Sequence, residues 1–267
     1  MRNMRREEGF TLVQISIALV VFGLIVGSML TGRSYEHMGA VRSDISQLEK
    51  YQSATESFKQ KYNYLPGDIP AALAVQLKLT RRDGAEGRGD GNGLVEGYVY
   101  SSNHVMASAQ SGEPLFFWED LFSTDLIKDA FSTATDTELG TDIPVASAGE
   151  YLPDAQVGNG NRLYVYSDNK VNYYGLSVVT KIDGTVGTLT SHPGLTTAEA
   201  YDIDKKIDDG LPVTGKVLAR YVNDGVKEAP SARVSSSDTC YDTITSQYSV
   251  SHSKDSNLNC ALSFRFE

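Results

Sequence analysis

The chain has 267 residues, 40% of them hydrophobic, and a formal net charge of −10. This length allows one large domain or two small ones, and the composition is that of a core-forming globular protein rather than a disordered one. The acidic excess argues against a nucleic-acid-binding surface, which needs clustered Lys and Arg, and it is compatible with divalent cations.

The first thirty residues are the most informative part of the sequence. A short charged leader, residues 1–8, ends at Gly9 and is followed by the apolar run FTLVQISIALVVFGLIVGSML, with no charged side chain before Arg33. As a helix, this run is long enough to cross a hydrocarbon core of ~30 Å. It is also longer than the apolar core of a cleaved secretory signal. Three arginines in the leader place the N-terminus on the cytoplasmic side.

Helical periodicity continues beyond the apolar run. One face carries Met38, Val41, Ile45, Leu48, Tyr51, Thr55, Phe58 and Tyr62 at steps of three or four residues. The polar residues between them, Asp44 included, are expected to face solvent. Residues 63–67 break the pattern with Pro and Gly. The sequence therefore predicts one continuous helix from about Phe10 to Tyr62, whose second half lies on a globular domain through a single apolar stripe.

Gly9, followed by Phe10-Thr11-Leu12-Val13 and a long helix, resembles the class III signal of type IV prepilins and type II secretion pseudopilins. The resemblance implies cleavage between Gly9 and Phe10 by a prepilin peptidase and methylation of the new amino terminus. It also implies assembly with other pilin or pseudopilin subunits, on an inner-membrane assembly platform, into a helical filament. An ordinary single-span membrane anchor is the competing interpretation.

The same resemblance implies the domain organisation and the location. Residues 1–9 are a cleaved leader, residues 10–33 a transmembrane and filament-core helix, and residues 34–267 a head that includes the amphipathic second half of the helix. The expected fold is α+β and pilin-like, with an antiparallel β-sheet packed on the long helix. We expect a single-pass inner-membrane protein with a cytoplasmic N-terminus and a periplasmic head, which then enters a filament in the periplasm or at the cell surface.

Gln14 departs from the family pattern, which usually has Glu at the fifth position after the cleavage site. A carboxylate there is thought to neutralise the amino terminus of a neighbouring subunit. Gln keeps hydrogen-bonding capacity but carries no charge. Gln14 is therefore expected to act in assembly and to mark a minor or atypical subunit.

The glycine-rich stretch that follows the helix has oxygen donors at close spacing. Asp90, Asn92 and Glu96 lie at alternating or near-alternating positions, with the Leu94 carbonyl between Asn92 and Glu96. Hard cations such as Ca²⁺ take several such oxygens on a bent loop, so these four residues are a candidate calcium site. A metal-free glycine-rich turn is the other interpretation. Asp68, in a segment that resembles the KY-x-x-LPGD motif of pilins, is expected to cap the segment after it.

The rest of the head reads as short elements. Residues 113–122 predict a core helix, residues 162–166 and 171–179 a β-hairpin, and residues 196–208 a helix with Asp204 facing outward. Residues 132–161 predict an irregular surface segment, and residues 213–222 and 261–266 predict further strands. These elements fit an antiparallel sheet laid on the long helix.

Two cysteines, Cys240 and Cys260, lie near the C-terminus. Outside the inner membrane they are expected to pair, whereas in a reducing compartment they would be two buried thiols. The four histidines have no metal-ligand spacing, and no nucleophile or phosphate-binding motif is present, so the sequence predicts no enzyme. Besides a filament subunit, a membrane- or filament-displayed adhesin or cargo-binding module remains open, with calcium as a stabiliser.

Overall fold

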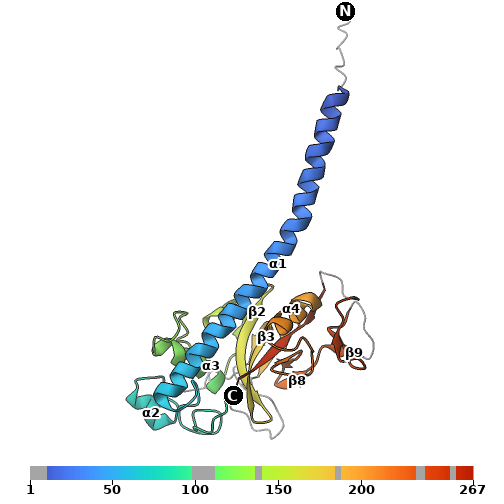
Figure 1. Cartoon of the computed structure of the whole chain (residues 1–267). Coiled ribbons are helices and arrows are strands. Elements are labelled where there is room, and N and C mark those ends of the chain that lie inside the picture. Colours follow the sequence, from blue (N-terminus) through green and yellow to red (C-terminus); the bar gives the residue numbers. More distant parts are fainter. Residues whose placement is uncertain are drawn as a thin grey trace, which may run out of the picture. The chain divides into compact units, whose positions relative to one another are not determined.

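The computed structural model describes residues 11–97, 112–135, 140–183, 188–232, 238–252 and 257–266. It combines helices with a mainly antiparallel sheet, so the predicted α+β class is confirmed (Figure 1). The chain divides into two compact units, Met1–Ala40 and Val41–Glu267. The leader, with Gly9 and Phe10, lies outside the described residues.

The long helix is α1, Leu12–Tyr62, and its predicted continuity is confirmed. In its second half the predicted stripe is buried, with Val41 and Phe58 at 0% exposure and Tyr51 at 1%. These side chains belong to the same hydrophobic core as the sheet. This packing stabilises the helix, because most helical stability in proteins comes from tertiary packing of an amphipathic face.

The main sheet is built around β3, Val171–Ile182. Its antiparallel partners are β1 (Ile143–Pro144), β2 (Asn161–Asp168), β4 (Leu189–His192) and β13 (Leu262–Phe266), and β13 also pairs with β6 (Val217–Leu218). The predicted hairpin is β2–β3, in the register Val165↔Tyr174. Its two-residue turn has positive φ at Asn169 and Lys170, as a type I′ turn requires.

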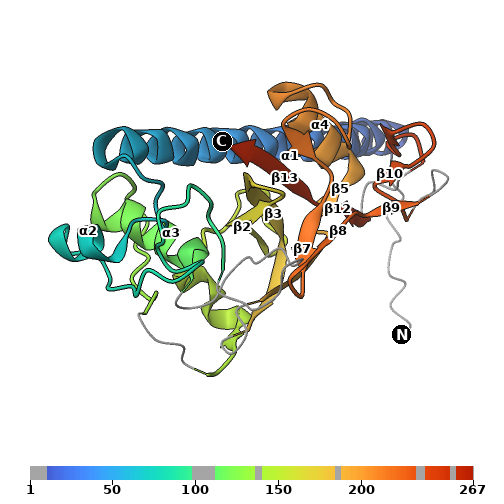
Figure 2. The same cartoon turned by 90° about the horizontal axis from the view of Figure 1, so that it is seen from below.

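Shorter elements surround this sheet (Figure 2). The helices are α2 (Ala71–Gln76), α3 (Glu113–Ser123), the 3₁₀-helix η1 (Val145–Glu150) and α4 (Thr197–Ile207). The strands are β5 (Leu195–Thr196), β7 (Tyr221–Asn223), β8 (Val226–Glu228), β9 (Ser231–Ala232), β10 (Tyr241–Asp242), β11 (Gln247–Tyr248) and β12 (Leu258–Cys260).

Helices α3 and α4 confirm the predicted elements and correct one detail. In α3 nearly every residue is buried, and Trp118 is fully buried among aromatic rings. In α4, Thr196 and Glu199 form a capping box, which fixes where the helix begins. Asp204 was expected to face outward, and this is wrong: it is 0% exposed and accepts hydrogen bonds from the Tyr248 hydroxyl and the Gly210 N–H.

The segment predicted to be an irregular surface, residues 132–161, also belongs partly to the fold. Its described residues contain β1 and η1, and they bury Ala148 and Leu152 in the core. The prediction was wrong because this segment is rich in Ser, Thr, Gly and Asp, and its few apolar residues follow no helical or strand periodicity.

Candidate functional site

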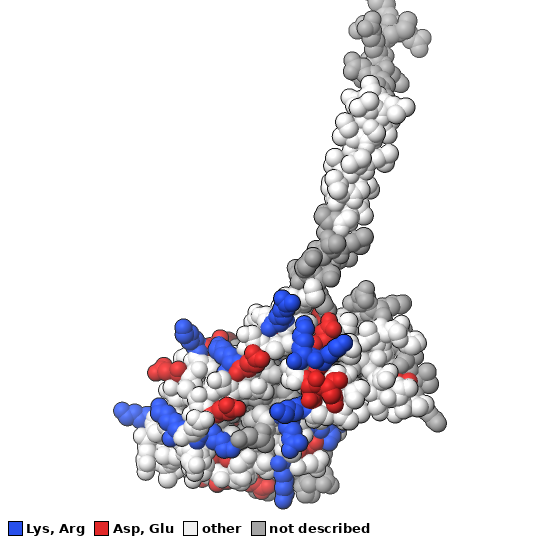
Figure 3. Space-filling model, in the orientation of Figure 1, with Lys and Arg blue, Asp and Glu red and all other residues white. Residues whose placement is uncertain are grey.

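The first part of α1 exposes large apolar side chains on all sides. Leu12 is 85% exposed, Phe22 67% and Leu24 69%. No charged residue occurs between positions 11 and 27, and this stretch is uniformly uncharged in Figure 3, whereas the head carries both signs. Exposed apolar surface of this extent marks a region that another molecule or a membrane covers.

Within the described residues, no helix reaches the combined length and apolarity required of a membrane-crossing segment.

The first turn of α1 closes on itself through Thr11 and Gln14. The Thr11 N–H donates to Gln14 Oε1 at 2.9 Å, and the Gln14 N–H donates to Thr11 Oγ1 at 3.3 Å. This is a capping box, in which Gln takes the place of Glu. The T-x-x-Q spacing was available as a local signal in the sequence, but the predicted role of Gln14 concerned assembly alone.

The second half of α1 is held to the head by polar contacts as well as by its apolar stripe. Asp44 was expected to face solvent, and this is wrong: it is 6% exposed and accepts the N–H groups of Gln156, at 2.6 Å, and Val157, at 3.1 Å. Burial raises the pKa of Asp44 to about 6. One turn later, Gln47 Nε2 donates to the Asp154 carbonyl at 2.9 Å. The segment before β2 is therefore fastened to the helix.

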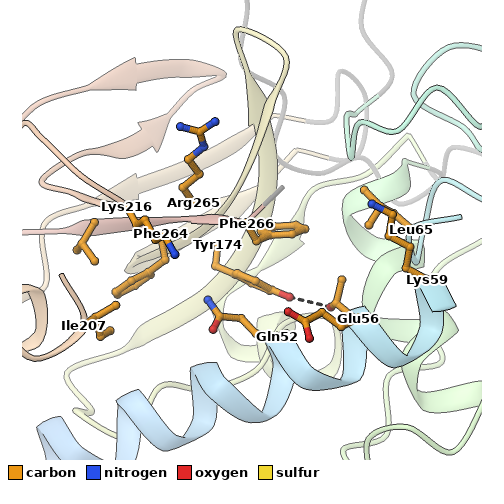
Figure 4. Close-up of a pocket in the computed structure, with 12 residues that line it drawn as sticks. Gln52, Glu56, Lys59, Leu65, Tyr174, Ile207, Lys216, Phe264, Arg265 and Phe266 are labelled. Carbon is orange, nitrogen blue, oxygen red and sulfur yellow. Dashed lines mark hydrogen bonds between the residues drawn. The ribbon is translucent and has the colours of Figure 1, made fainter.

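A groove lies beside the same part of α1, at its contact with the sheet (Figure 4). Its volume is about 380 Å³, and it is lined by Gln52, Thr55, Glu56, Lys59, Leu65, Tyr174, Ile207, Lys216, Val217, Phe264, Arg265 and Phe266. Alternating residues of β13 set its character: Phe264 and Phe266 form an apolar floor, while Lys59 and Lys216 lie toward its two ends. No local sequence pattern indicated this groove, because its walls come from segments far apart in the chain.

The glycine-rich loop brings together three of the four residues predicted to bind calcium. Asn92 Nδ2 donates to Asp90 Oδ2 at 2.9 Å and to Glu96 Oε1 at 2.7 Å, while Asn92 Oδ1 accepts the Leu94 N–H. The Asn92 amide thus occupies oxygens that an ion would need. Leu94 takes part through its N–H in these contacts, not through its carbonyl.

A tighter carboxylate group lies beside this loop. Oxygen atoms of Asp68, Asp90 and Glu113 lie within 4.8 Å of one another. Several oxygen ligands at such spacing are what Ca²⁺ takes, so these residues offer a better donor set than the four predicted ones. Asp68 and Glu113 were missed because 45 positions separate them, with no local pattern to join them.

Backbone N–H groups already donate hydrogen bonds to the carboxylates of Asp68 and Glu113. Asp68 was expected to cap the segment after it, and this is wrong: its carboxylate accepts the N–H groups of Gly91, Asn92 and Gly93 at 2.7–3.1 Å. The fully buried Glu113 accepts those of Gly89 and Glu96. Burial, together with the neighbouring carboxylates, raises the pKa of Asp68 to about 7 and that of Glu113 well above its usual value.

A buried ion pair anchors the turn at the start of this region. Arg82 and Asp120 are both 0% exposed at their side chains and form two parallel N–H···O contacts, at 2.7 and 3.0 Å. Asp120 also accepts the Gly67 N–H at 2.7 Å, and Arg82 donates to the Gly67 carbonyl. Such a pair is costly to break, since either partner left alone is an uncompensated buried charge.

Cys240 and Cys260 form the predicted disulfide, and both are fully buried. The Cys260 carbonyl accepts the Gly194 N–H, and the Cys240 carbonyl accepts the Ser249 N–H. The bond therefore joins the C-terminal loop to the strand that precedes β13.

No family model, no curated protein and no solved structure matches this chain.

Proposed function

We propose that this chain is a structural subunit of a type IV pilus or type II secretion pseudopilus. It is cut by a prepilin peptidase between Gly9 and Phe10 and assembles through its N-terminal helix with other subunits, on an inner-membrane platform. Before assembly it spans the inner membrane once, with its head in the periplasm. Its fold is then pilin-like, and its work is mechanical rather than enzymatic.

The observation that carries this proposal is the contrast between the two parts of α1. From Leu12 to Val26 all side chains are exposed and all but Gln14 and Ser16 are apolar, whereas from Val41 onward one stripe is buried in the head core. If the only role of α1 were to pack against the head, its exposed apolar first part would have no function. A filament subunit needs both, because one part packs among other helices and the other fixes the head to that bundle.

The proposal is tested at the cleavage site. The chain is expressed in a bacterial host with a prepilin peptidase and in the same host without it, and the N-terminal peptide is read by mass spectrometry. We expect N-methylated Phe10 in the first host alone, and none for Gly9→Val. An uncut Met1, or a cut at another site in both hosts, would refute the proposal.

The groove beside α1 favours a second function, that of a displayed adhesin or cargo-binding module. An apolar floor flanked by two lysines is a setting in which a ligand with apolar and acidic parts binds. Binding of a ligand by residues 34–267, lost in Phe264→Ala, would support this function. If the chain is cleaved after Gly9 but no such ligand is found, only the filament function would be supported.

A further inference from the structure

Two segments of the sequence Gly-Asn-Gly occur in the chain, at residues 91–93 and 158–160. When Gly follows Asn, the Gly nitrogen can approach the Asn side-chain amide with little hindrance, because Gly has no side chain of its own. Both Asn92 and Asn159 are exposed to water. The two segments therefore share their local sequence and differ in what the fold places around them.

The fold places a proton acceptor at the Gly93 nitrogen, which is the atom that would attack the Asn92 amide. The Gly93 N–H donates to Asp68 Oδ2 at 2.7 Å. The other oxygen of the same carboxylate, Oδ1, accepts the N–H groups of Gly91 and Asn92. Asp68 is 0% exposed, so its carboxylate is a fixed acceptor for the proton that an attacking Gly93 nitrogen must lose.

Both ends of the Asn92 side-chain amide are held as well. Oδ1 accepts the Leu94 N–H at 2.7 Å, so a donor already lies at the oxygen that becomes negative when the amide carbon is attacked. This contact is an Asx turn, which folds the side chain back over the Gly93 peptide. Nδ2, the leaving nitrogen, donates to Asp90 Oδ2 at 2.9 Å and to Glu96 Oε1 at 2.7 Å. The reacting groups are therefore oriented before the reaction begins.

We propose that Asn92 is a self-modification site, at which the Gly93 nitrogen attacks Asn92 Cγ and the side-chain amide is lost as ammonia. The Gly93 N–H proton passes to Asp68, which returns it to solvent. The new N–Cγ bond closes a cyclic succinimide, and the Cγ–Nδ2 bond breaks as Nδ2 takes up a proton from solvent. Water then opens the ring at either carbonyl carbon, which leaves aspartate or isoaspartate at position 92.

The reaction changes the glycine-rich loop irreversibly, because ammonia is lost. The Asn92 amide donates to Asp90 and Glu96, whereas a carboxylate at the same position repels both of these groups. Each molecule that has reacted therefore carries one more negative charge in this loop and lacks the amide contacts that join its acidic residues.

Asn159 is the matched control within the same chain. It too lies between two glycines, but its side chain makes no hydrogen bond to any described residue, and it lies in a turn with φ of 56°. The local sequence alone would give the two sites equal reactivity. A difference between them in the folded protein therefore reports the groups that surround Asn92.

The test follows both Asn residues in one sample of the full chain. The protein is kept in detergent at neutral pH with EDTA, which removes any bound metal, and its peptides are analysed by mass spectrometry over time. We expect Asn92 to lose its amide about 100-fold faster than Asn159. The product should contain both aspartate and isoaspartate, and in denaturant the two sites should react at equal rates. Equal rates in the folded chain, a faster reaction at Asn159, or aspartate as the sole product would overturn the proposal.

Two variants assign the reaction to Asp68. Asp68→Asn keeps an oxygen for the Gly93 N–H, but a neutral amide is a far weaker proton acceptor, so the reaction at Asn92 should slow about 100-fold. The matched control is Asp83→Asn, since Asp83 accepts the Ala85 N–H in the same glycine-rich segment and should leave the rate unchanged. The Asn159 rate and the thermal midpoint show whether each variant is folded. An unchanged Asn92 rate in folded Asp68→Asn, or an equal slowing in Asp83→Asn, contradicts the role of Asp68.

Discussion

The hydroxyl groups of Thr55 on α1 and Tyr174 on β3 lie 2.8 Å apart in the buried core. They join the long helix directly to the central strand of the sheet. Both residues are almost fully buried, with Thr55 at 4% and Tyr174 at 0% exposure. The attachment of the helix to the head therefore depends on a paired polar contact as well as on apolar area.

We expect Tyr174→Phe to lower the free energy of unfolding by about 1–3 kcal/mol, because the Thr55 hydroxyl is left buried without its partner. Thr55→Val combined with Tyr174→Phe should cost less than the two single changes together, since both polar groups are then gone. Chemical denaturation of the full chain in detergent measures this. The control is Tyr62→Phe, a partly buried residue whose hydroxyl makes no hydrogen bond to any described residue, and an equal loss there would contradict the assignment.

The disulfide predicts a second stability effect. Replacing Cys240 and Cys260 by Ala should destabilise the head by about 3 kcal/mol, the value for a closed loop of this size. Because both sulfur atoms are buried, reductant alone should leave the bond intact until the protein unfolds. Alkylation followed by mass spectrometry checks this: labelling of the native protein at the rate seen in denaturant would show that the bond is accessible.

Asp44 predicts how stability depends on pH. Its folded pKa, about 6, lies above the ordinary value of 3.8, so the folded state binds its proton more tightly than the unfolded state. Its contribution to stability is therefore complete below about pH 4 and is lost as pH rises through about 6. Asp44→Asn keeps an oxygen for the Gln156 and Val157 N–H groups and removes the titration.

We expect Asp44→Asn to flatten the fall in stability between pH 4 and 7, by on the order of 1–3 kcal/mol. Denaturation midpoints across this range, for the wild-type chain and the variant, measure the difference. Glu49→Gln, on the exposed side of the same helix, is the control and should leave the profile unchanged. Parallel profiles for wild type and Asp44→Asn would show that this carboxylate does not titrate as its burial implies.

A calcium titration of variants can distinguish between two candidate donor sets that share Asp90. If an ion binds the group of Asp68, Asp90 and Glu113, millimolar Ca²⁺ should raise the thermal midpoint, and Asp68→Asn or Glu113→Gln should abolish the rise. If it binds the set predicted from the sequence, Glu96→Gln should abolish the rise and Asp68→Asn should not. We expect the first result, because it brings three carboxylates within 4.8 Å of one another, whereas the Asn92 amide already occupies Glu96. No rise in the wild-type chain would leave the loop as a metal-free turn.

The sequence predicted the elements whose signals are local. The 3.6-residue stripe defined α1, two β-rich runs around Ser-Asp-Asn-Lys defined the β2–β3 hairpin, and apolar residues at spacings of three and four defined α4. Each of these patterns is read from neighbouring residues. Periodicity alone was sufficient because each element buries one face against a common core.

Polar residues with distant partners could not be predicted in the same way. Asp44 looks like a solvent-facing helix residue until the Gln156 N–H, 112 positions away, is placed beside it. Asp68 looks like a cap until the loop at residues 91–93 folds back onto it. In both cases the partner is a backbone N–H group, which every non-proline residue has, so side-chain identity gives no clue.

Gly175 tests how closely the central strands fit together. It is paired across from Tyr164 in β2, and a Cβ atom at this position would overlap the Tyr164 ring. Neither the ring nor the β3 backbone has room to shift, because Tyr164 is fully buried and bonded to Ser177 and Val222. We therefore expect Gly175→Ala to destabilise the head by about 1–3 kcal/mol or more.

Gly39→Ala is the matched control: it lies in α1 with nothing within 4 Å of its added carbon, and it should stabilise the helix by about 0.5–1 kcal/mol. Thermal unfolding of both variants measures the difference, and a neutral Gly175→Ala would mean that Tyr164 can leave its place in the sheet.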